Sequence, residues 1–258
     1  MLNKILETKR REIDELVLPE QKKVAHFSLY ESLKNPNHTI GLIAEVKKAS
    51  PSKGLICENF DPEMIAKGYE AGGADAISVL TDIEYFQGHR DFLSAVKDVC
   101  SLPVMRKDFI IDKKQIDETV RIGADAMLLI VGTVPIKELE ILYNYAYDNG
   151  LECLVEVHAK DELVELLSTF TPKIIGVNNR NLKTFETSLN QTEEMASLIP
   201  EGSLFISESG IHKEADILRV KSVGATGVLV GESLMRAQSP TIGIKKLFGG
   251  EFRESATT

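Results

Sequence analysis

Three stretches of the chain are versions of one phrase: GGADAISVL at residues 72–80, IGADAMLLIV at residues 122–131 and VGATGVLVG at residues 223–231. Their aligned glycines, Gly73, Gly123 and Gly224, stand 50 and 101 residues apart, which is close to one and two copies of a period of about fifty residues. In each copy a helical pattern ends at glycine, where a left-handed cap is easiest, and an apolar run follows at once. This join of helix, glycine and strand is typical of a parallel sheet.

Outward from these phrases, short apolar runs alternate with amphipathic segments such as DPEMIAKGYEAGG at residues 61–73. The alternation predicts parallel strands that are covered by helices and buried on both faces. Eight such units in about 220 residues favour a closed (β/α)₈ TIM barrel, and a doubly wound dinucleotide fold loses support because no G-x-G-x-x-G follows the first strand. The predicted strands are residues 40–47, 75–81, 103–107, 126–131, 152–157, 173–178, 203–208 and 226–231.

A single barrel domain accounts for the whole length of 258 residues. Residues 1–39 are predicted to form an N-terminal helical extension, residues 40–249 the eight units, and residues 250–258 a polar tail. The extension carries an apolar stripe, which suits a helix packed on the barrel or one that closes over the active site; its members are Leu2, Ile5, Leu6, Ile13 and Leu16.

Composition excludes several functional classes. The 39 acidic residues against 30 Lys and Arg give a net charge of -9, which argues against nucleic acid or an anionic membrane surface as a partner. The longest uncharged apolar run, residues 126–136, is too short to span a bilayer, so we expect a cytoplasmic protein. The three cysteines form no C-x-x-C pair and the five histidines have no metal-ligand spacing, so no disulfide framework and no metal are expected.

Charged side chains interrupt the apolar strands near their carboxyl ends. Glu45 and Lys47 lie two residues apart on the first strand, and Lys107, Glu156 and Glu208 follow on the third, fifth and seventh. Closure of the barrel would bring these three carboxylates and two ammonium groups together, and buried charges persist when they are paired or functional. Burial and charge pairing shift the pKa of such groups in opposite directions, so residue type alone does not assign the acid and the base.

The last two strands end in small residues with free backbone N–H groups, in SESGI at 207–211 and VGES at 230–233. Loops after strands seven and eight of such barrels often bind phosphate, although glycines there also serve simply to allow tight turns. The candidate phosphate-binding residues are Ser50 from the first loop together with Ser209, Gly210, Gly231, Glu232 and Ser233.

Several phrases on the expected strands, in their expected order, make the chain resemble the indole-3-glycerol phosphate synthase family over nearly its whole length. They are IAEVKKASPSKG (43–54), LTDIEYFQGHRDFL (80–93), RKDFIID (106–112), LVEVH (154–158), IGVNNRNL (175–182), SESGI and VGESLM (230–235). The resemblance implies a TIM barrel that converts 1-(2-carboxyphenylamino)-1-deoxyribulose 5-phosphate into indole-3-glycerol phosphate, carbon dioxide and water without cofactor or metal.

The resemblance also implies roles. Lys107 would be the general acid that protonates the substrate ketone, and Glu156 the partner in the later proton loss and dehydration. Lys47 would hold the substrate carboxylate and share acid duty with Lys107, while Glu45 would orient the lysines and bind sugar hydroxyls.

The remaining polar positions of the family correspond to Asn178 and Glu208, with Arg180 as support behind them. Phe109 and Leu129 suit either contacts to the aromatic ring or plain core positions. The histidines near strand ends, His89, His158 and His212, are interpreted as surface residues or as supports behind the site.

Two other functions are weighed against this interpretation. Phosphoribosylanthranilate isomerase, a related phosphate-binding barrel, uses Cys at the end of strand one and Asp at strand six, where this chain has Glu45, Lys47 and Asn178. A barrel without catalytic activity that binds a phosphorylated metabolite as a scaffold is the second alternative. A monomer is expected, and docking to other enzymes of tryptophan synthesis stays open.

Overall fold

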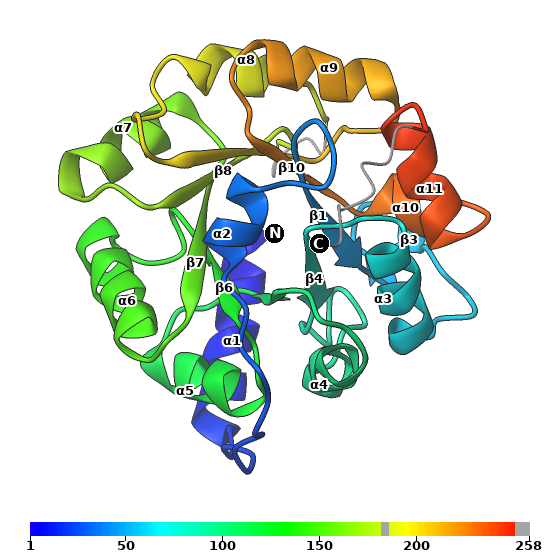
Figure 1. Cartoon of the computed structure of the whole chain (residues 1–258). Coiled ribbons are helices and arrows are strands. Elements are labelled where there is room, and N and C mark those ends of the chain that lie inside the picture. The colour runs from blue at the N-terminus through cyan, green and yellow to red at the C-terminus, as the bar shows by residue number, and fades with distance from the viewer. Residues whose placement is uncertain (182–185, 251–258) are drawn as a thin grey trace.

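The computed structural model describes residues 1–181 and 186–250, and its centre is a closed barrel of eight parallel strands inside a ring of helices (Figure 1). Around the barrel the order is β1, β4, β5, β6, β7, β8, β9, β10 and back to β1, so each barrel strand pairs with its neighbours along the chain. The barrel strands are β1 (Gly41–Val46), β4 (Ala76–Leu80), β5 (Val104–Lys107), β6 (Ala126–Ile130), β7 (Glu152–Val157), β8 (Ile174–Asn178), β9 (Leu204–Glu208) and β10 (Gly227–Val230). The predicted (β/α)₈ TIM barrel is confirmed, and every predicted strand matches an observed one to within a residue or two.

Helices follow each barrel strand and begin where the sequence supplies a cap. Asp61 accepts hydrogen bonds from two backbone N–H groups at the start of α3, and Asp112 forms a capping box with Gln115 at the start of α5. The helices are α1 (Leu2–Glu15), α2 (Leu29–Lys34), α3 (Pro62–Ala71), α4 (Arg90–Val99), α5 (Lys113–Arg121), α6 (Ile136–Asp148), α7 (Lys160–Thr169), α8 (Asn190–Ala196), α9 (Glu214–Ser222), α10 (Glu232–Met235) and α11 (Pro240–Leu247).

The repeated glycines end helices as the sequence predicts. Gly73, Gly123 and Gly224 follow α3, α5 and α9 with φ angles of 86°, 87° and 101°, in the left-handed region that only glycine adopts without strain. The strand that follows each of them begins within three residues.

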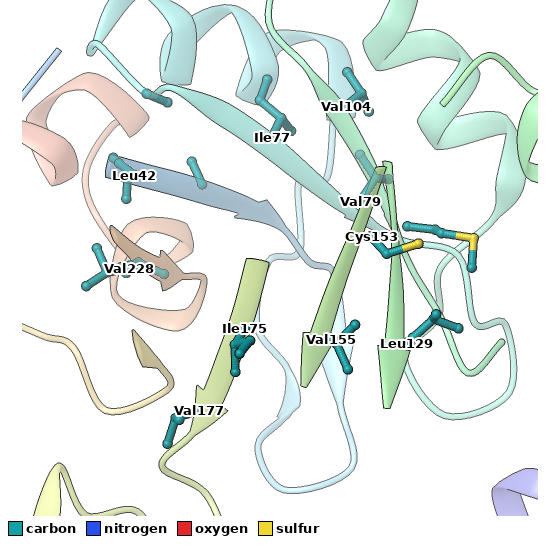
Figure 2. Close-up of a cluster of buried hydrophobic side chains, with 14 of the residues drawn as sticks. Leu42, Ile77, Val79, Val104, Leu129, Cys153, Val155, Ile175, Val177 and Val228 are labelled. Atoms are coloured by element: carbon teal, nitrogen blue, oxygen red, sulfur yellow. The ribbon is translucent and has the colours of Figure 1, made fainter. Parts of the chain in front are cut away.

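The apolar core has two layers because both faces of every barrel strand are buried. Side chains that point outward pack against the helices, and Figure 2 shows members of this layer from successive strands, including Val79, Leu129 and Val155. Side chains that point inward, such as Ile43, Met105 and Leu154, fill the barrel interior. This alternation decides the position of Leu129: it belongs to the outer layer, away from the barrel interior.

The N-terminal extension reaches both ends of the barrel. Helix α2 lies across the amino-terminal ends of the strands, at the centre of Figure 1, and its Leu29 and Leu33 complete the inner core. Residues between α1 and α2 run along the outside, where the backbone N–H of Lys22 donates to the carbonyl of Arg121 at 2.8 Å. Helix α1 therefore sits toward the opposite end, where the strands end.

Two further expectations concern the C-terminal tail and membrane-spanning segments. The predicted polar tail lies outside the described residues, apart from Gly250. Within the described part of the chain, no helix has the length and apolar character needed to cross a membrane.

Candidate active site

A cavity opens at the carboxyl ends of the barrel strands, and every site residue predicted from the sequence lines it. The barrel strands and the loops that follow them bring these residues together from six different β/α units. They are Glu45, Lys47, Ser50, Lys107, Glu156, Asn178, Arg180, Glu208, Ser209, Gly210, Gly231, Glu232 and Ser233.

Lys107 is at the centre of the charged cluster. Its Nζ lies 3.3 Å from Oε2 of Glu156 and 3.7 Å from Oε2 of Glu208. Glu156 also accepts a hydrogen bond at Oε1 from Nδ2 of Asn178, at 3.2 Å. On the first strand, Lys47 donates a hydrogen bond to the carboxylate of Glu45. Since these side chains are buried or nearly so, the pairs act in a medium that screens charge weakly.

The cluster shifts the pKa values of its members in different directions. Burial alone would lower the pKa of Lys107, but Glu156, Glu208 and Glu45 outweigh it and raise that pKa, so the ammonium keeps its proton. Burial alone would raise the pKa of Glu156, but Lys107 and His158 outweigh it and lower it. For Glu45, Lys47 and Lys107 likewise outweigh burial and lower the pKa.

Glu208 behaves in the opposite way. Burial raises its pKa well above the ordinary value, and the neighbouring Glu156 carboxylate adds to the rise, while Lys107 only partly opposes it. Two carboxylates that share one small site do not both ionise easily, and of the two groups Glu156 is the one that favours the ionised form. The site thus combines an ammonium group that keeps its proton, a carboxyl group whose pKa is lowered and a second carboxyl group whose pKa is raised.

Two glycines make room for these carboxylates. A Cβ on Gly176 of β8 would collide with the carboxylate of Glu208. A Cβ on Gly231, just after β10, would collide with the carboxylate of Glu45 and lie 3.0 Å from Nζ of Lys47. A side chain at either position would displace the ionic groups, so the absence of a side chain is part of the site geometry.

The loop after β9 has a backbone conformation suited to an anion. Ser209 and Gly210 both have positive φ, 66° and 81°, which for serine is an uncommon conformation that its surroundings must hold. The buried side chain of Asn179 supplies that support, because its Nδ2 donates to the carbonyl oxygens of Glu208 and Ser209, each at 3.0 Å. Sequence reasoning did not place Asn179 in the site.

The loop after β10 leads directly into α10, which begins at Glu232. The first N–H groups of a helix have no carbonyl partner within it, so Glu232 and Ser233 present backbone donors. The hydroxyl of Ser233 donates to the carbonyl of Ile211 at 2.9 Å and ties this loop to the one after β9. The two loops together form a concave set of backbone donors beside the charged cluster.

A two-stranded hairpin, β2 (Ala49–Ser50) with β3 (Gly54–Leu55), forms the loop after β1 and was not predicted. It reaches two other loops of the cavity: Nη1 of Arg180 donates to Oγ of Ser52 at 3.2 Å, and Nζ of Lys53 lies 3.5 Å from Oε1 of Glu232. Arg180 therefore supports the first loop, in addition to lining the cavity.

Apolar side chains close one side of the cavity. Helix α1 contributes Leu2 and Ile5, which join Phe86, Phe109 and Leu128 in the lining. Of the two residues considered either as ring contacts or as core, Phe109 lines the cavity and Leu129 belongs to the outer core, whereas Leu128, the neighbour of Leu129, points inward. The extension therefore packs on the barrel and also contributes side chains to the cavity lining.

Sequence reasoning missed an ionic anchor beneath α1. Nζ of Lys9 lies 2.7 Å from Asp82 and 2.9 Å from Asp108, the residues that follow β4 and β5 closely. Arg106 lies 3.2 Å from Asp108 and 2.8 Å from Glu118, which extends the network behind Lys107. Because side chains alternate along a strand, the sequence could have suggested that Arg106 and Lys107 face opposite sides. No sequence pattern, however, links Lys9 to Asp82 and Asp108.

Among the described residues, no group of three or more His, Cys, Asp or Glu side chains is arranged to hold a metal ion. The cavity lining includes groups that bind organic anions: the ammonium groups of Lys47, Lys53 and Lys107, the guanidinium of Arg180 and backbone N–H donors.

The chain matches the family model described as "Indole-3-glycerol phosphate synthase" over residues 2–247. It is 64% identical to the indole-3-glycerol phosphate synthase of Halalkalibacterium halodurans over 251 residues, which are 97% of this chain and 98% of that protein. The protein of the same name from Priestia megaterium is 59% identical over 249 residues, 96% of this chain and 98% of that protein.

Among solved structures the chain is similar in fold to a 3-hexulose-6-phosphate synthase, with a TM-score of 0.65 and 16% identity over 82% of this chain and 99% of that one. An N-acetylmannosamine-6-phosphate 2-epimerase from Clostridium perfringens has a TM-score of 0.63 at 14% identity, covering 84% of this chain and 94% of the other. At such low identity these likenesses support the barrel fold alone.

Proposed function

Because the chain belongs to the indole-3-glycerol phosphate synthase family, we propose that it closes the indole ring of 1-(2-carboxyphenylamino)-1-deoxyribulose 5-phosphate, releasing carbon dioxide and water. This is the chemistry of a decarboxylating lyase in tryptophan synthesis. The observation that carries the assignment of residues is the position of Lys107, a protonated amine between Glu156 and Glu208 at the base of a cavity rimmed by backbone donors.

Lys107 is proposed as the general acid. Its raised pKa means that it holds a proton at neutral pH, and it can pass that proton to the ketone oxygen as the aromatic carbon attacks the ketone carbon. Lys47, which follows β1 and lines the same cavity, is proposed to bind the substrate carboxylate until that group leaves as carbon dioxide. The Lys47 pairing with Glu45 keeps this ammonium oriented before substrate arrives.

Glu156 is proposed as the base for the later proton loss and dehydration. Its lowered pKa keeps it ionised, and the hydrogen bond from Asn178 fixes its carboxylate. Glu208 is proposed to act as a neutral hydrogen-bonding group beside it, in keeping with its raised pKa.

The phosphate of the substrate is proposed to lie against the loops after β9 and β10. Ser209, Gly210, Gly231, Glu232 and Ser233 supply backbone N–H groups there, and Ser50 faces the same cavity from the first loop. Binding of the phosphate by these loops and of the carboxylate by Lys47 would hold the ketone and the aromatic carbon near Lys107, as ring closure requires.

No observation favours the two alternatives considered from the sequence. The family match spans residues 2–247, and the proposed acid and base are both present, which a scaffold would not need. We also propose that the protein acts in the cytoplasm and that it is a monomer.

The direct experiment mixes purified protein with the carboxyphenylamino-deoxyribulose phosphate and follows indole fluorescence and carbon dioxide release together. We expect both signals in equal amounts. Folded protein that binds the substrate and yields neither product would instead favour the scaffold.

A further inference from the structure

His158 stands beside the proposed base. It follows Glu156 by two residues and comes directly after the end of β7, and both side chains line the cavity. Its Nε2 lies 3.0 Å from Oε1 of Glu156, the same oxygen that accepts the hydrogen bond from Asn178. Lys107 faces the other oxygen, Oε2. The two oxygens of the Glu156 carboxylate therefore have separate sets of partners.

The backbone of His158 is held at both of its polar groups. Its N–H donates to Oε2 of Glu162, in the first turn of α7, at 2.6 Å. Its carbonyl oxygen accepts a hydrogen bond from the side chain of Gln191, on α8. The side chain is only 9% exposed, so the ring has little freedom to leave Glu156. Such fixation from neighbouring elements is typical of a residue that orients another group.

The charges around the ring favour its protonated form. Two carboxylates and one ammonium face it: Glu156 at 3.0 Å, Glu162 at 4.0 Å from Nδ1, and Lys107 beyond Glu156. Burial and Lys107 lower the pKa of His158, but Glu156 and Glu162 outweigh them and raise it above its ordinary value. The imidazolium is thus stable to higher pH than that of an exposed histidine.

We propose that His158 is a positioning residue that holds one oxygen of the Glu156 carboxylate, so that the other stays beside Lys107 and faces the reacting atoms. This inference rests on the proposed function of Glu156 as the base. It predicts that loss of the ring disturbs the chemical step more than substrate binding, because His158 acts through Glu156 rather than on the phosphate loops.

The kinetic test compares the wild type with His158→Leu and His158→Gln. Leu removes the contact, whereas the amide of Gln can place a neutral donor near the position of Nε2. We expect His158→Leu to lower kcat by about 10-fold or more, with KM within about threefold, because the ion pair between His158 and the Glu156 carboxylate is lost. His158→Gln should recover only part of that loss, because its amide can donate a hydrogen bond but carries no charge.

The pH profile separates positioning from a merely structural role. As pH rises through the pKa of His158, the wild type loses its imidazolium and kcat should fall, well before Lys107 loses its proton. This fall in kcat at high pH is the basic limb of the profile. His158→Gln has no imidazolium to lose and should therefore lack the basic limb. The control is His89→Asn, at the start of α4, which keeps a capping side chain and should retain both kcat and the limb.

A second measurement does not need turnover. The chain has five histidines, so NMR can follow each imidazole through a pH titration, with His158→Gln to assign the signal. We expect the pKa of His158 to lie above the ordinary value for histidine, and Glu156→Gln to lower it toward that value.

The outcomes distinguish a failure of the proposed function from a failure of the positioning role of His158. A wild type without turnover but with the expected titration would contradict the proposed function and support the contact between His158 and Glu156. An active wild type whose His158→Leu and His158→Gln variants keep its kcat and its basic limb would overturn the positioning role. The positioning role would also be overturned if Glu156→Gln left the pKa of His158, measured by NMR, unchanged.

Discussion

Replacement of Lys9 by Met tests whether the ionic anchor beneath α1 stabilises the protein. The side chain is 2% exposed, and its Nζ contacts Asp82 at 2.7 Å and Asp108 at 2.9 Å. Met preserves much of the apolar stem and removes the charge, so two buried carboxylates lose their common partner. A surface ion pair would contribute little, but this pair is buried on both sides.

The expected loss follows from that burial. Removal of one partner from a buried ion pair costs about 3–5 kcal/mol, and we take the lower end because Arg106 still lies 3.2 Å from Asp108. For a protein of this size, about 3 kcal/mol corresponds to a fall in Tm of about 6–12 °C. Circular dichroism melts at pH 7 measure it directly. Arg10→Met on the exposed side of the same helix is the matched control, with a change within about 0.5 kcal/mol.

The dependence on pH gives this prediction a second measure. Burial alone would raise the pKa of Asp108, but Lys9 and Arg106 outweigh it and lower that pKa. Such a carboxyl contributes stability above its unfolded pKa and loses it as pH falls through the folded value. The pKa of Lys9 is raised, so its contribution is complete below its unfolded value of 10.5 and is lost only above that pH.

In the variant, Asp108 keeps Arg106 but has lost Lys9, so it can take up a proton more easily than in the wild type. The deficit in Tm relative to the wild type should therefore be largest near pH 7 and shrink as pH is lowered toward 4. A Lys9→Met melt within about 2 °C of the wild type at pH 7, or one equal to that of Arg10→Met, would refute the anchor.

Three further variants test the site. Glu156→Gln should lower kcat by about 10²-fold or more while KM stays near the wild-type value, because the base is lost and the phosphate loops are untouched; unaltered steady-state rates would contradict its role. Glu208→Gln should cost less, within about 10-fold in kcat, because its raised pKa means that a neutral amide replaces a neutral carboxyl group; equal damage from the two Gln variants would show that Glu208 must ionise. Gly231→Ala should lower kcat/KM by about 10-fold or more, because the added methyl group collides with the carboxylate of Glu45. A wild-type kcat/KM would show that the loop after β10 can shift without loss of activity.

The strands could be predicted closely because a parallel barrel buries both faces of each strand, and local patterns report that burial. The run from Glu152 to Val157 was predicted with its observed bounds, and the glycines Gly73, Gly123 and Gly224 marked where helices end. Because the strands close into a barrel, the charged residues at their carboxyl ends could be predicted to share one cavity even before any distance between them was known.

What the sequence could not supply depends on contacts between distant segments. The apolar stripe predicted for α1 includes Ile13 and Leu16, which are only half-buried, whereas Lys9 is among the most buried side chains of the protein. A lysine in a helix looks like a solvent-facing residue until its carboxylate partners are known. The different charge states of Glu156 and Glu208 likewise depend on their shared position and not on residue type.

The central claim is that Lys107 donates the proton that allows ring closure. Its most direct test is the kcat of Lys107→Ala with the carboxyphenylamino-deoxyribulose phosphate, beside wild type and the surface control Lys67→Ala. We predict a fall in kcat of about 10²–10⁴-fold, with a much smaller change in affinity for the phosphorylated substrate and no effect of the control. Turnover by folded Lys107→Ala near the wild-type rate would contradict the account.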